Sequence, residues 1–331
     1  MSEVLAVVLE DSLGSLRPLV SSHNITNSQL IASLRHLKPS TRFKAHWQYN
    51  NIPYLLASQL PEQLHGELFH SFVQDHIWNP LGMHHTYYDH VLANRTGDLS
   101  SGFARRLPHG YSGFLDIEAC RDDIKRSTRL SAKCRGQELD LGWFQTDWRS
   151  FAGAGGIITC SRDLVRLEWI PAPNPSSMLT RRAYLCLQII WLETLLLKGS
   201  NPTTGEQIIP SAIIDATITP NIAPRPKATD PETTVPYYGL AQLMYDYRGY
   251  RVIEHGGDVP GQRSQVIRLS DKMIGVAIMV NDEHLGGLYR EVITWRIIDH
   301  LLGLRPVDFK TRSVAVLCLM TWPQTHNART S

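Results

Sequence analysis

The sequence lacks the features that mark several common classes of protein. Its five cysteines are an odd number, and no two stand at Cys-x-x-Cys spacing, so neither a disulfide framework nor a zinc cluster is predicted. They are Cys120, Cys134, Cys160, Cys186 and Cys318. The net charge is only +2, and no run of basic residues is longer than the pairs Arg105-Arg106 and Arg181-Arg182. The charge pattern therefore predicts no nucleic-acid partner and no anionic membrane surface.

Long hydrophobic runs and a leader peptide are also missing. The longest apolar stretch, residues 183–197, contains a glutamine and a glutamate and is shorter than the ~20 residues of a spanning helix. The first eleven residues carry three acidic side chains and no basic ones, which is unlike a signal peptide. A hydrophobic content of 43% with 19% charged residues is typical of a folded protein. We therefore expect a soluble, cytoplasmic protein with no membrane partner.

Several motifs of enzyme chemistry do not occur. There is no Gly-x-Ser-x-Gly elbow, no His-Glu-x-x-His, no P-loop and no Gly-x-Gly-x-x-Gly after a strand. The stretch HHTYYDH at 84–90 could be a metal site, but it follows a turn and has no partner cluster. The glycines of GAGG at 153–156 could bind phosphate, although a tight turn explains them equally without a lysine partner. No metal site is predicted.

Hydrophobic spacing predicts helices in the first half of the chain. Residues 27–37 have leucine and isoleucine at helical spacing, and residues 49–78 continue as helix with breaks near Pro61 and Gly66. A further helix is expected after Ser161 as N-cap, with Asp163 in its first turn.

The second half predicts an antiparallel meander. After a proline-rich loop at 219–236, strand-like runs occupy 237–282, with turns at Arg248-Gly249 and Ser270-Asp271. A helix at 287–304 follows. One of its faces is apolar and comprises Leu288, Val292, Trp295, Ile298 and Leu302. Helices followed by a meander and a packed helix indicate an α+β architecture.

Two short polar motifs remain, Tyr49-Asn50-Asn51 and His255-Gly256-Gly257. The stretches around them are WQYNNIPYLLASQLPEQ, FVQDHIWNPLGMHHTYYD, AGAGGIITCSRDLV and YRGYRVIEHGGDVPGQRSQVIRLSD, in this order. This ordered set resembles the serine β-lactamase and penicillin-binding-protein superfamily, in particular its class C-related esterases and acyltransferases. The resemblance implies a β-lactamase/transpeptidase-like fold, an antiparallel sheet flanked by helices plus a mainly helical region.

The resemblance also implies a chemistry. In that family a serine attacks a carbonyl, and the tyrosine that matches Tyr49 accepts or relays its proton. Asn51 matches the residue that orients the substrate or a neighbouring lysine, and His255 matches the first residue of the third motif, where imidazole can donate or carry charge near neutral pH. Gly256 and Gly257 would let backbone approach the substrate, and the Asp258 backbone N–H would complete an oxyanion hole.

The implied function is acyl transfer or hydrolysis through an acyl-enzyme. The substrate would be an ester, lactone, thioester or amide of a small metabolite, a secondary metabolite among the options, and neither a metal nor an organic cofactor is needed. Two plainer interpretations stay open. Tyr49 could be a buried tyrosine bonded to a helix end, and His255-Gly256-Gly257 could be a simple turn.

The chain departs from the family at the nucleophile. The family's serine stands three residues before a lysine, but none of the eight lysines here has a serine at that position. The only hydroxyl match is Thr41 before Lys44, eight residues from Tyr49. The alternative function is therefore a catalytically inactive pseudoenzyme, or a fragment, that at most binds an acyl-bearing ligand.

Two segments differ from their surroundings. Residues 167–190 interrupt what would otherwise read as one amphipathic helix, which predicts an anomalous insertion, and 310–331 form an atypical tail. We expect a single domain over 1–331 that lacks the N-terminal segment of the family.

Overall fold

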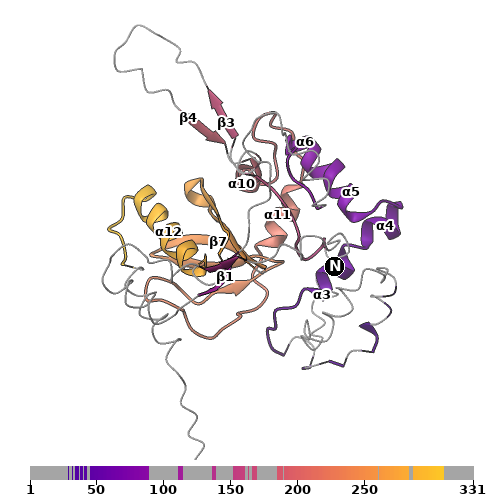
Figure 1. The fold of residues 1–331 in the computed structure, drawn as a ribbon, viewed down its shortest axis with the longest axis horizontal. Helices are drawn as coiled ribbons and strands as arrows, with labels where there is room; N and C mark the ends of the chain where they lie inside the picture. Colours follow the sequence, from indigo (N-terminus) through magenta and orange to yellow (C-terminus); the bar gives the residue numbers. More distant parts are fainter. Residues whose placement is uncertain are drawn as a thin grey trace, which may run out of the picture. The chain divides into compact units, whose positions relative to one another are not determined.

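The structure is a computed structural model. It describes residues 45–88, 111–114, 136–138, 152–160, 166–169, 185–188, 190–259, 261–282 and 286–308, together with Asp163 and scattered positions between 29 and 42 (Figure 1). Residue contacts divide the chain into two compact units. The first comprises residues 1–107, 142–255 and 267–275, and the second 108–141, 256–266 and 276–331. The single-domain organisation stays a prediction.

The predicted helical region after Tyr49 is confirmed and is divided into short helices. They are α3 (Ile52–Ala57), α4 (Leu60–His65), α5 (Phe69–Val73), the π-helical turn η2 (Gln74–Trp78) and α6 (Asn79–Leu81). Pro61 stands in the first turn of α4, where its missing N–H costs nothing, so α3 ends before it. Gly66 ends α4 with a φ of 72°, a conformation that favours glycine.

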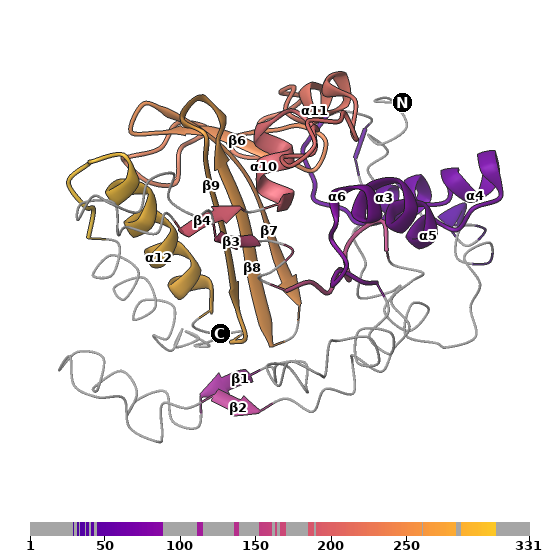
Figure 2. The ribbon, with the colours of Figure 1, turned by 90° about the horizontal axis from the view of Figure 1, so that it is seen from above.

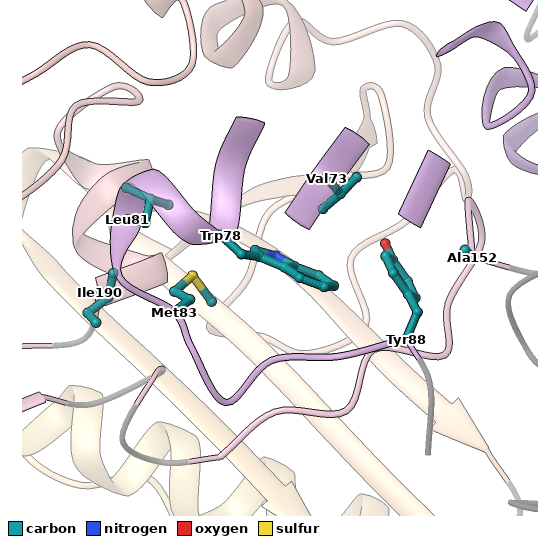
Figure 3. Packing of buried hydrophobic residues seen from close by; sticks show 7 residues of the cluster. All are labelled: Val73, Trp78, Leu81, Met83, Tyr88, Ala152 and Ile190. Atoms are coloured by element: carbon teal, nitrogen blue, oxygen red, sulfur yellow. The ribbon is translucent and has the colours of Figure 1, made fainter. Parts of the chain in front are cut away.

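These helices bury an apolar cluster inside the first unit (Figure 3). Its members are Val73, Trp78, Leu81, Met83, Tyr88, Ala152 and Ile190. The indole of Trp78 lies beside the ring of Tyr88, with centroids 5.0 Å apart. The same burial raises the pKa of the Tyr88 phenol well above its usual range, so this side chain stays protonated and serves packing.

A buried carboxylate links the segment after α6 to residue 163. Asp163 Oδ2 accepts hydrogen bonds from the backbone N–H of His85 and the hydroxyl of Thr86, both at 2.7 Å. The sequence assigned Asp163 to a helix dipole. Asp163 is indeed helical, but the partners of its carboxylate are tertiary. The proposed N-cap, Ser161, lies outside the described residues.

The strands after residue 236 form the predicted meander. They are β5 (Tyr237–Tyr238), β6 (Leu243–Tyr247), β7 (Tyr250–Val259), β8 (Gln262–Leu269) and β9 (Ile274–Val280), and they neighbour one another in chain order (Figure 2). The turns at Arg248-Gly249 and Ser270–Lys272 are confirmed. A further break at 239–242 separates β5 from β6.

The final helix, α12 (Gly286–Leu301), is confirmed together with its apolar face. Trp295 and Ile298 are buried and Leu288 and Val292 are partly buried, while Ile293 on the other side is 44% exposed. The loop at 219–236 contains no helix or strand, as predicted. The α+β class is therefore confirmed.

The remaining elements include two small hairpins and two helices. Strands β1 (Tyr111–Phe114) and β2 (Gly136–Glu138) pair with each other, as do β3 (Arg166–Trp169) and β4 (Leu185–Gln188), and α10 (Ile190–Leu196) and α11 (Ser211–Thr217) follow. Leu167 is the register partner of Leu187, so the start of the anomalous segment lies beside residues near its end. That it is an insertion stays a prediction, and the tail at 310–331 lies outside the described residues. Over the described ranges, no helix has the length and hydropathy to cross a membrane.

Candidate active site

The motif Tyr49-Asn50-Asn51 is held by the start of helix α3. Asn50 Oδ1 accepts the backbone N–H of Ile52, the first residue of α3, at 2.8 Å, a local bond that fixes the chain just before the helix. The carbonyl oxygen of Asn51 accepts the N–H groups of Tyr54 and Leu55, both at 3.1 Å. The Asn51 side chain makes no capping bond, so its amide is not used to start the helix.

Tyr49 and His255 lie together. Their ring centroids are 6.3 Å apart with 33° between the ring planes. The Tyr49 side chain is 41% exposed, which excludes the interpretation that it is a buried tyrosine of the core. The sequence predicted both residues for one site, and the fold places an ionisable phenol beside an imidazole at the surface of the first unit.

Two further tyrosines complete the cluster around His255. The hydroxyl of Tyr238 is 3.1 Å from His255 Nε2, and the Trp47 ring meets the Tyr238 ring edge-on with centroids 5.8 Å apart. Tyr54 is hydrogen-bonded to Tyr238 and to the backbone of Ala241. The sequence did not single out Trp47, Tyr54 or Tyr238, because a strand pattern gives no signal for which side chain meets His255.

Burial sets the protonation of two of these phenols. Desolvation raises the pKa of Tyr238 well above its usual range, and the neighbouring Tyr54 and Tyr49 raise it further. Desolvation also raises the pKa of Tyr54. Both are therefore hydrogen-bond donors at neutral pH, and neither is a base.

The third motif is strand and not turn. His255, Gly256 and Gly257 all lie inside β7, and the chain turns only after Val259. The interpretation of His-Gly-Gly as a simple turn is therefore wrong. A strand leaves its backbone available along an edge or a face, and this is the setting in which a glycine lets another group approach.

Contacts within the protein explain why residues 256 and 257 are glycines. A Cβ at Gly256 would lie 3.1 Å from Arg290 Nη1, and a Cβ at Gly257 would overlap the Ser264 hydroxyl. The sequence attributed both glycines to close approach of a substrate. In the second unit, the groups that actually approach them are side chains of β8 and α12.

Asp258 anchors two arginines in that unit. Its Oδ1 accepts Nη1 of Arg263 and Nη1 of Arg290, each at 3.1 Å, and the same Arg290 nitrogen donates to the Ser264 carbonyl at 3.0 Å. The Asp258 carboxylate is half exposed, so these pairs contribute little stability and mainly orient the guanidinium groups. The role of the Asp258 backbone N–H in an oxyanion hole stays a prediction.

The hydroxyl alternative, Thr41, is among the described residues. Thr41 lies in a bend, and its hydroxyl donates to the Arg42 carbonyl at 3.2 Å. Thr41, Arg42 and Ala45 lie in bends, and residues 43 and 44 lie outside the described residues, so the spatial relation of Thr41 to Lys44 stays a prediction. Within the part that the structure describes, no three His, Cys, Asp or Glu side chains are grouped as a metal site requires.

Comparison with known proteins shows which family the sequence around this cluster matches. A family model described as Beta-lactamase matches residues 12–296. An unguisins hydrolase, ungD of Aspergillus violaceofuscus, is 26% identical over 310 residues, which is 90% of this chain and 44% of that protein. A second one, ungD' of Aspergillus campestris, is 22% identical over 86% of this chain and 42% of its own length. The chain thus spans less than half the length of these two relatives.

Two solved structures share the fold. The D-amino acid amidase of Ochrobactrum anthropi SV3, complexed with D-phenylalanine, aligns with a TM-score of 0.53 and 15% identity over 90% of this chain and 77% of its own. The octameric penicillin-binding protein homologue of Pyrococcus abyssi aligns with a TM-score of 0.52 and 18% identity over 92% of this chain and 56% of its own. At these identities the likeness concerns the fold alone.

Proposed function

Because this chain belongs to the beta-lactamase family of hydrolases, we propose that its tyrosine–histidine cluster serves acyl transfer or hydrolysis at the carbonyl of a small metabolite. The substrate class is an ester, lactone or amide. Tyr49 accepts or relays a proton, and His255 supplies a hydrogen bond or positive charge beside the reacting carbonyl. Asn51 orients the substrate, and Gly256, Gly257 and Asp258 provide backbone for binding it.

The observation that carries this proposal is the juxtaposition of Tyr49 and His255. A phenol with an ordinary pKa near 10 becomes a base only where neighbours favour its phenolate. The His255 imidazole, with its centroid 6.3 Å from that of Tyr49, can do so through an N–H group or a positive charge. Tyr49 is also exposed, so that a substrate can reach it, whereas Tyr54 and Tyr238 are held as protonated donors.

The relatives support a hydrolytic form of the reaction on a small metabolite. Two unguisins hydrolases match most of this chain. We extend only their reaction class to this protein, because it spans less than half of their length. The named substrate is a hypothesis for this chain that a direct turnover assay with unguisins would check.

A second candidate function follows from a specific feature of the sequence. No serine precedes a lysine at the three-residue spacing that the family uses for its nucleophile. If this chain acts alone, it lacks that nucleophile. It would then bind an acyl-bearing ligand through the same cluster and would not form a covalent intermediate. The two candidates therefore differ in whether a covalent adduct appears.

The deciding experiment is to react the purified chain with a fluorescent fluorophosphonate and, separately, with penicillin, and to map any adduct by mass spectrometry. Hydrolysis through an acyl-enzyme predicts one modified hydroxyl whose labelling slows in Tyr49→Phe. The matched control is Tyr237→Phe, since Tyr237 is similarly exposed, at 45%, and adjacent to the cluster in sequence.

Absence of any adduct would overturn the hydrolase proposal for this chain. Saturable binding of intact penicillin in a calorimeter, weakened by His255→Ala but not by Tyr237→Phe, would then establish the binding function. If the chain shows neither an adduct nor binding, both candidates are refuted for the chemical class of the two probes.

A further inference from the structure

We propose that Gln242 and Arg268 form a positioning pair for the candidate site: together they hold Ala241 in a left-handed conformation, and this conformation sets where helix α3 lies. Neither Gln242 nor Arg268 belongs to the two polar motifs, and both lie in the first unit. The placement of α3 is a property of the fold, whereas its catalytic consequence rests on the proposed function.

Ala241 has an unusual backbone conformation. It lies in the break between β5 and β6 with a φ of 56°, in the left-handed region that a residue with a Cβ rarely adopts. Its methyl group cannot compensate through a local hydrogen bond, as the side chain of an asparagine or aspartate can. Such a residue persists only where its surroundings impose the conformation, and such positions concentrate at functional sites.

The side chain of Gln242 bonds to this left-handed residue. Its Nε2 donates to the Ala241 carbonyl oxygen at 2.7 Å, and its Oε1 accepts Arg268 Nη1 at 2.8 Å. An amide can often be placed either way round, but here the partners allow one orientation, because a guanidinium group can only donate and a carbonyl can only accept. Arg268 therefore holds the amide so that its NH₂ group faces the Ala241 carbonyl.

Arg268 is an unusual residue for this task because it is only 2% exposed. Burial lowers the pKa of its guanidinium group to about 10, so the group stays charged at neutral pH. Among the described residues, its Nη2 has no hydrogen-bond partner. A buried cation that is bonded to a neutral amide contributes little stability. Its retention is better explained by the orientation that it gives to Gln242.

Helix α11 fixes the rest of the break. The Leu240 N–H donates to the Thr217 carbonyl at 3.0 Å, and a Cβ at Gly239 would overlap the same carbonyl oxygen. The Gly239 N–H donates to the Gln242 carbonyl at 2.8 Å, which closes the turn. The break is thus held by α11 on one side and by the Gln242 side chain on the other.

The Ala241 backbone connects this turn to α3. It bonds to the phenol oxygen of Tyr54, which lies in that helix. Burial raises the pKa of Tyr54 and this bond opposes the rise, so the Ala241 N–H is the donor, since an accepting carbonyl would have the opposite effect. Tyr54 also bonds to Tyr238 of β5. A change in the Ala241 conformation would therefore shift α3 and the 49–51 motif that precedes it.

The consequence for the site is a defined spacing of its two motifs. Strand β7 carries His255 and the start of α3 carries Tyr49, and their ring centroids are 6.3 Å apart. Gln242 would affect the reaction only through α3, so it is a positioning residue and not a catalytic residue.

The test reads the Tyr54 phenol by NMR. The full chain is labelled with tyrosine that carries ¹³C at Cζ, whose shift responds to hydrogen bonding of the phenol, and Tyr54→Phe identifies the resonance. Gln242→Leu removes both bonds of the amide and should move the Tyr54 resonance. Arg268→Met should move it in the same direction. The double variant should show no further change, because both substitutions release the same turn.

Gln207→Leu is the matched control. The Gln207 amide donates to the Lys198 carbonyl at 2.8 Å, and Lys198 is also left-handed, with a φ of 51°. The same arrangement thus occurs at the end of α10, outside the series of contacts that leads to Tyr54. Gln207→Leu should leave the Tyr54 resonance unchanged.

The proposal is overturned if a folded Gln242→Leu or Arg268→Met leaves the Tyr54 resonance in place, or if Gln207→Leu moves it equally. Thermal melting shows whether each variant is folded. If Gln242→Leu does not fold, Gln242→Glu decides. Its carboxylate still accepts from Arg268 but cannot donate to the Ala241 carbonyl, so the resonance should move.

This measurement needs no turnover. A chain that never forms an adduct would refute the hydrolase function, and the Tyr54 resonance would still test this inference. Where fluorophosphonate labelling does occur, it should be slower in Gln242→Leu than in Gln207→Leu. Equal labelling rates would overturn the role of Gln242 in positioning Tyr49.

Discussion

The phenol of Tyr49 lies beside the imidazole of His255, with 33° between their ring planes, although the two residues are far apart in sequence. The start of helix α3 fixes the first, and strand β7 fixes the second. Tyr238 stands between these two elements in sequence and bonds to His255. The cluster is therefore built by tertiary packing of short elements, and changes at their junctions should alter it in measurable ways.

Tyr49→Phe should slow covalent labelling by fluorophosphonate roughly 10²–10⁴-fold, which is the usual contribution of a general acid or base. Stability should not change, because the hydroxyl belongs to an exposed ring. Labelling reactions quenched at a series of times give the labelling rate, and thermal melting checks that the variant is folded. An equal loss in Tyr237→Phe would show that the effect is not specific to Tyr49.

Gly153→Ala should destabilise the first unit by about 1–3 kcal/mol, because the new methyl group would overpack a filled space. A Cβ there would lie 2.6 Å from Ser58 Cβ and against the backbone oxygen of Tyr54. Gly155→Ala is the control, since nothing lies within 4 Å of its Cβ. Urea unfolding of both variants gives the comparison, and equal midpoints would contradict this packing.

Gly257→Ala should destabilise the second unit, and Ser264→Ala should restore much of the loss. The Cβ of an alanine at 257 would overlap the Ser264 hydroxyl, whereas Ser264 Cβ is 3.8 Å away and leaves room. A double-mutant cycle in urea measures the coupling, which we expect to be favourable by about 1 kcal/mol or more. Additive effects of the two substitutions would mean that the glycine is required for another reason.

Asp163→Ala should lower the free energy of unfolding by about 3 kcal/mol, because it removes two hydrogen bonds to a carboxylate. Asp163 is only 2% exposed, so water cannot replace these bonds. Asp246→Ala is the matched control. Its carboxylate is 42% exposed and pairs with Arg251 at 3.8 Å, so we expect a change within about 0.5 kcal/mol. Denaturant midpoints that do not differ between the variants would show that Asp163 is not a structural brace.

Glu193→Gln should stabilise the chain at neutral pH and lose this advantage in acid. Burial raises the pKa of Glu193 above its ordinary 4.5, and among the described residues its Oε2 has no hydrogen-bond partner. A raised folded-state pKa means that stability is full below the unfolded-state pKa and falls as the pH rises through the folded-state pKa. The neutral glutamine does not undergo that loss.

The melting temperatures of wild type and Glu193→Gln should therefore differ most at pH 7 and converge toward pH 4. Glu206→Gln serves as the control, because Glu206 is exposed. A constant difference across this range would assign the effect to packing and not to ionisation.

The sequence alone determined the class of the fold and the positions of the two polar motifs. Alternation of apolar and polar residues located the strands of the meander, and helical spacing located α12 and the helices after Tyr49, because both patterns express which face of an element is buried. The order of the motifs around Tyr49 and His255 determined the family resemblance, and this resemblance is confirmed by the family model.

Only the tertiary structure decided which side chains meet. Pairing of β5 with β6 and of β6 with β7 brings Tyr238 to His255, and helix α3 brings Tyr54 to Tyr238. Neither tyrosine stands out in a strand or helix pattern. Likewise, Asp163 reads as a helix-start acid until Thr86 is seen beside it, and Gly257 reads as a ligand-facing glycine until Ser264 is seen against it. The physical reason is that periodicity specifies the buried face of each element, whereas hydrogen-bond partners depend on contacts between residues distant in sequence.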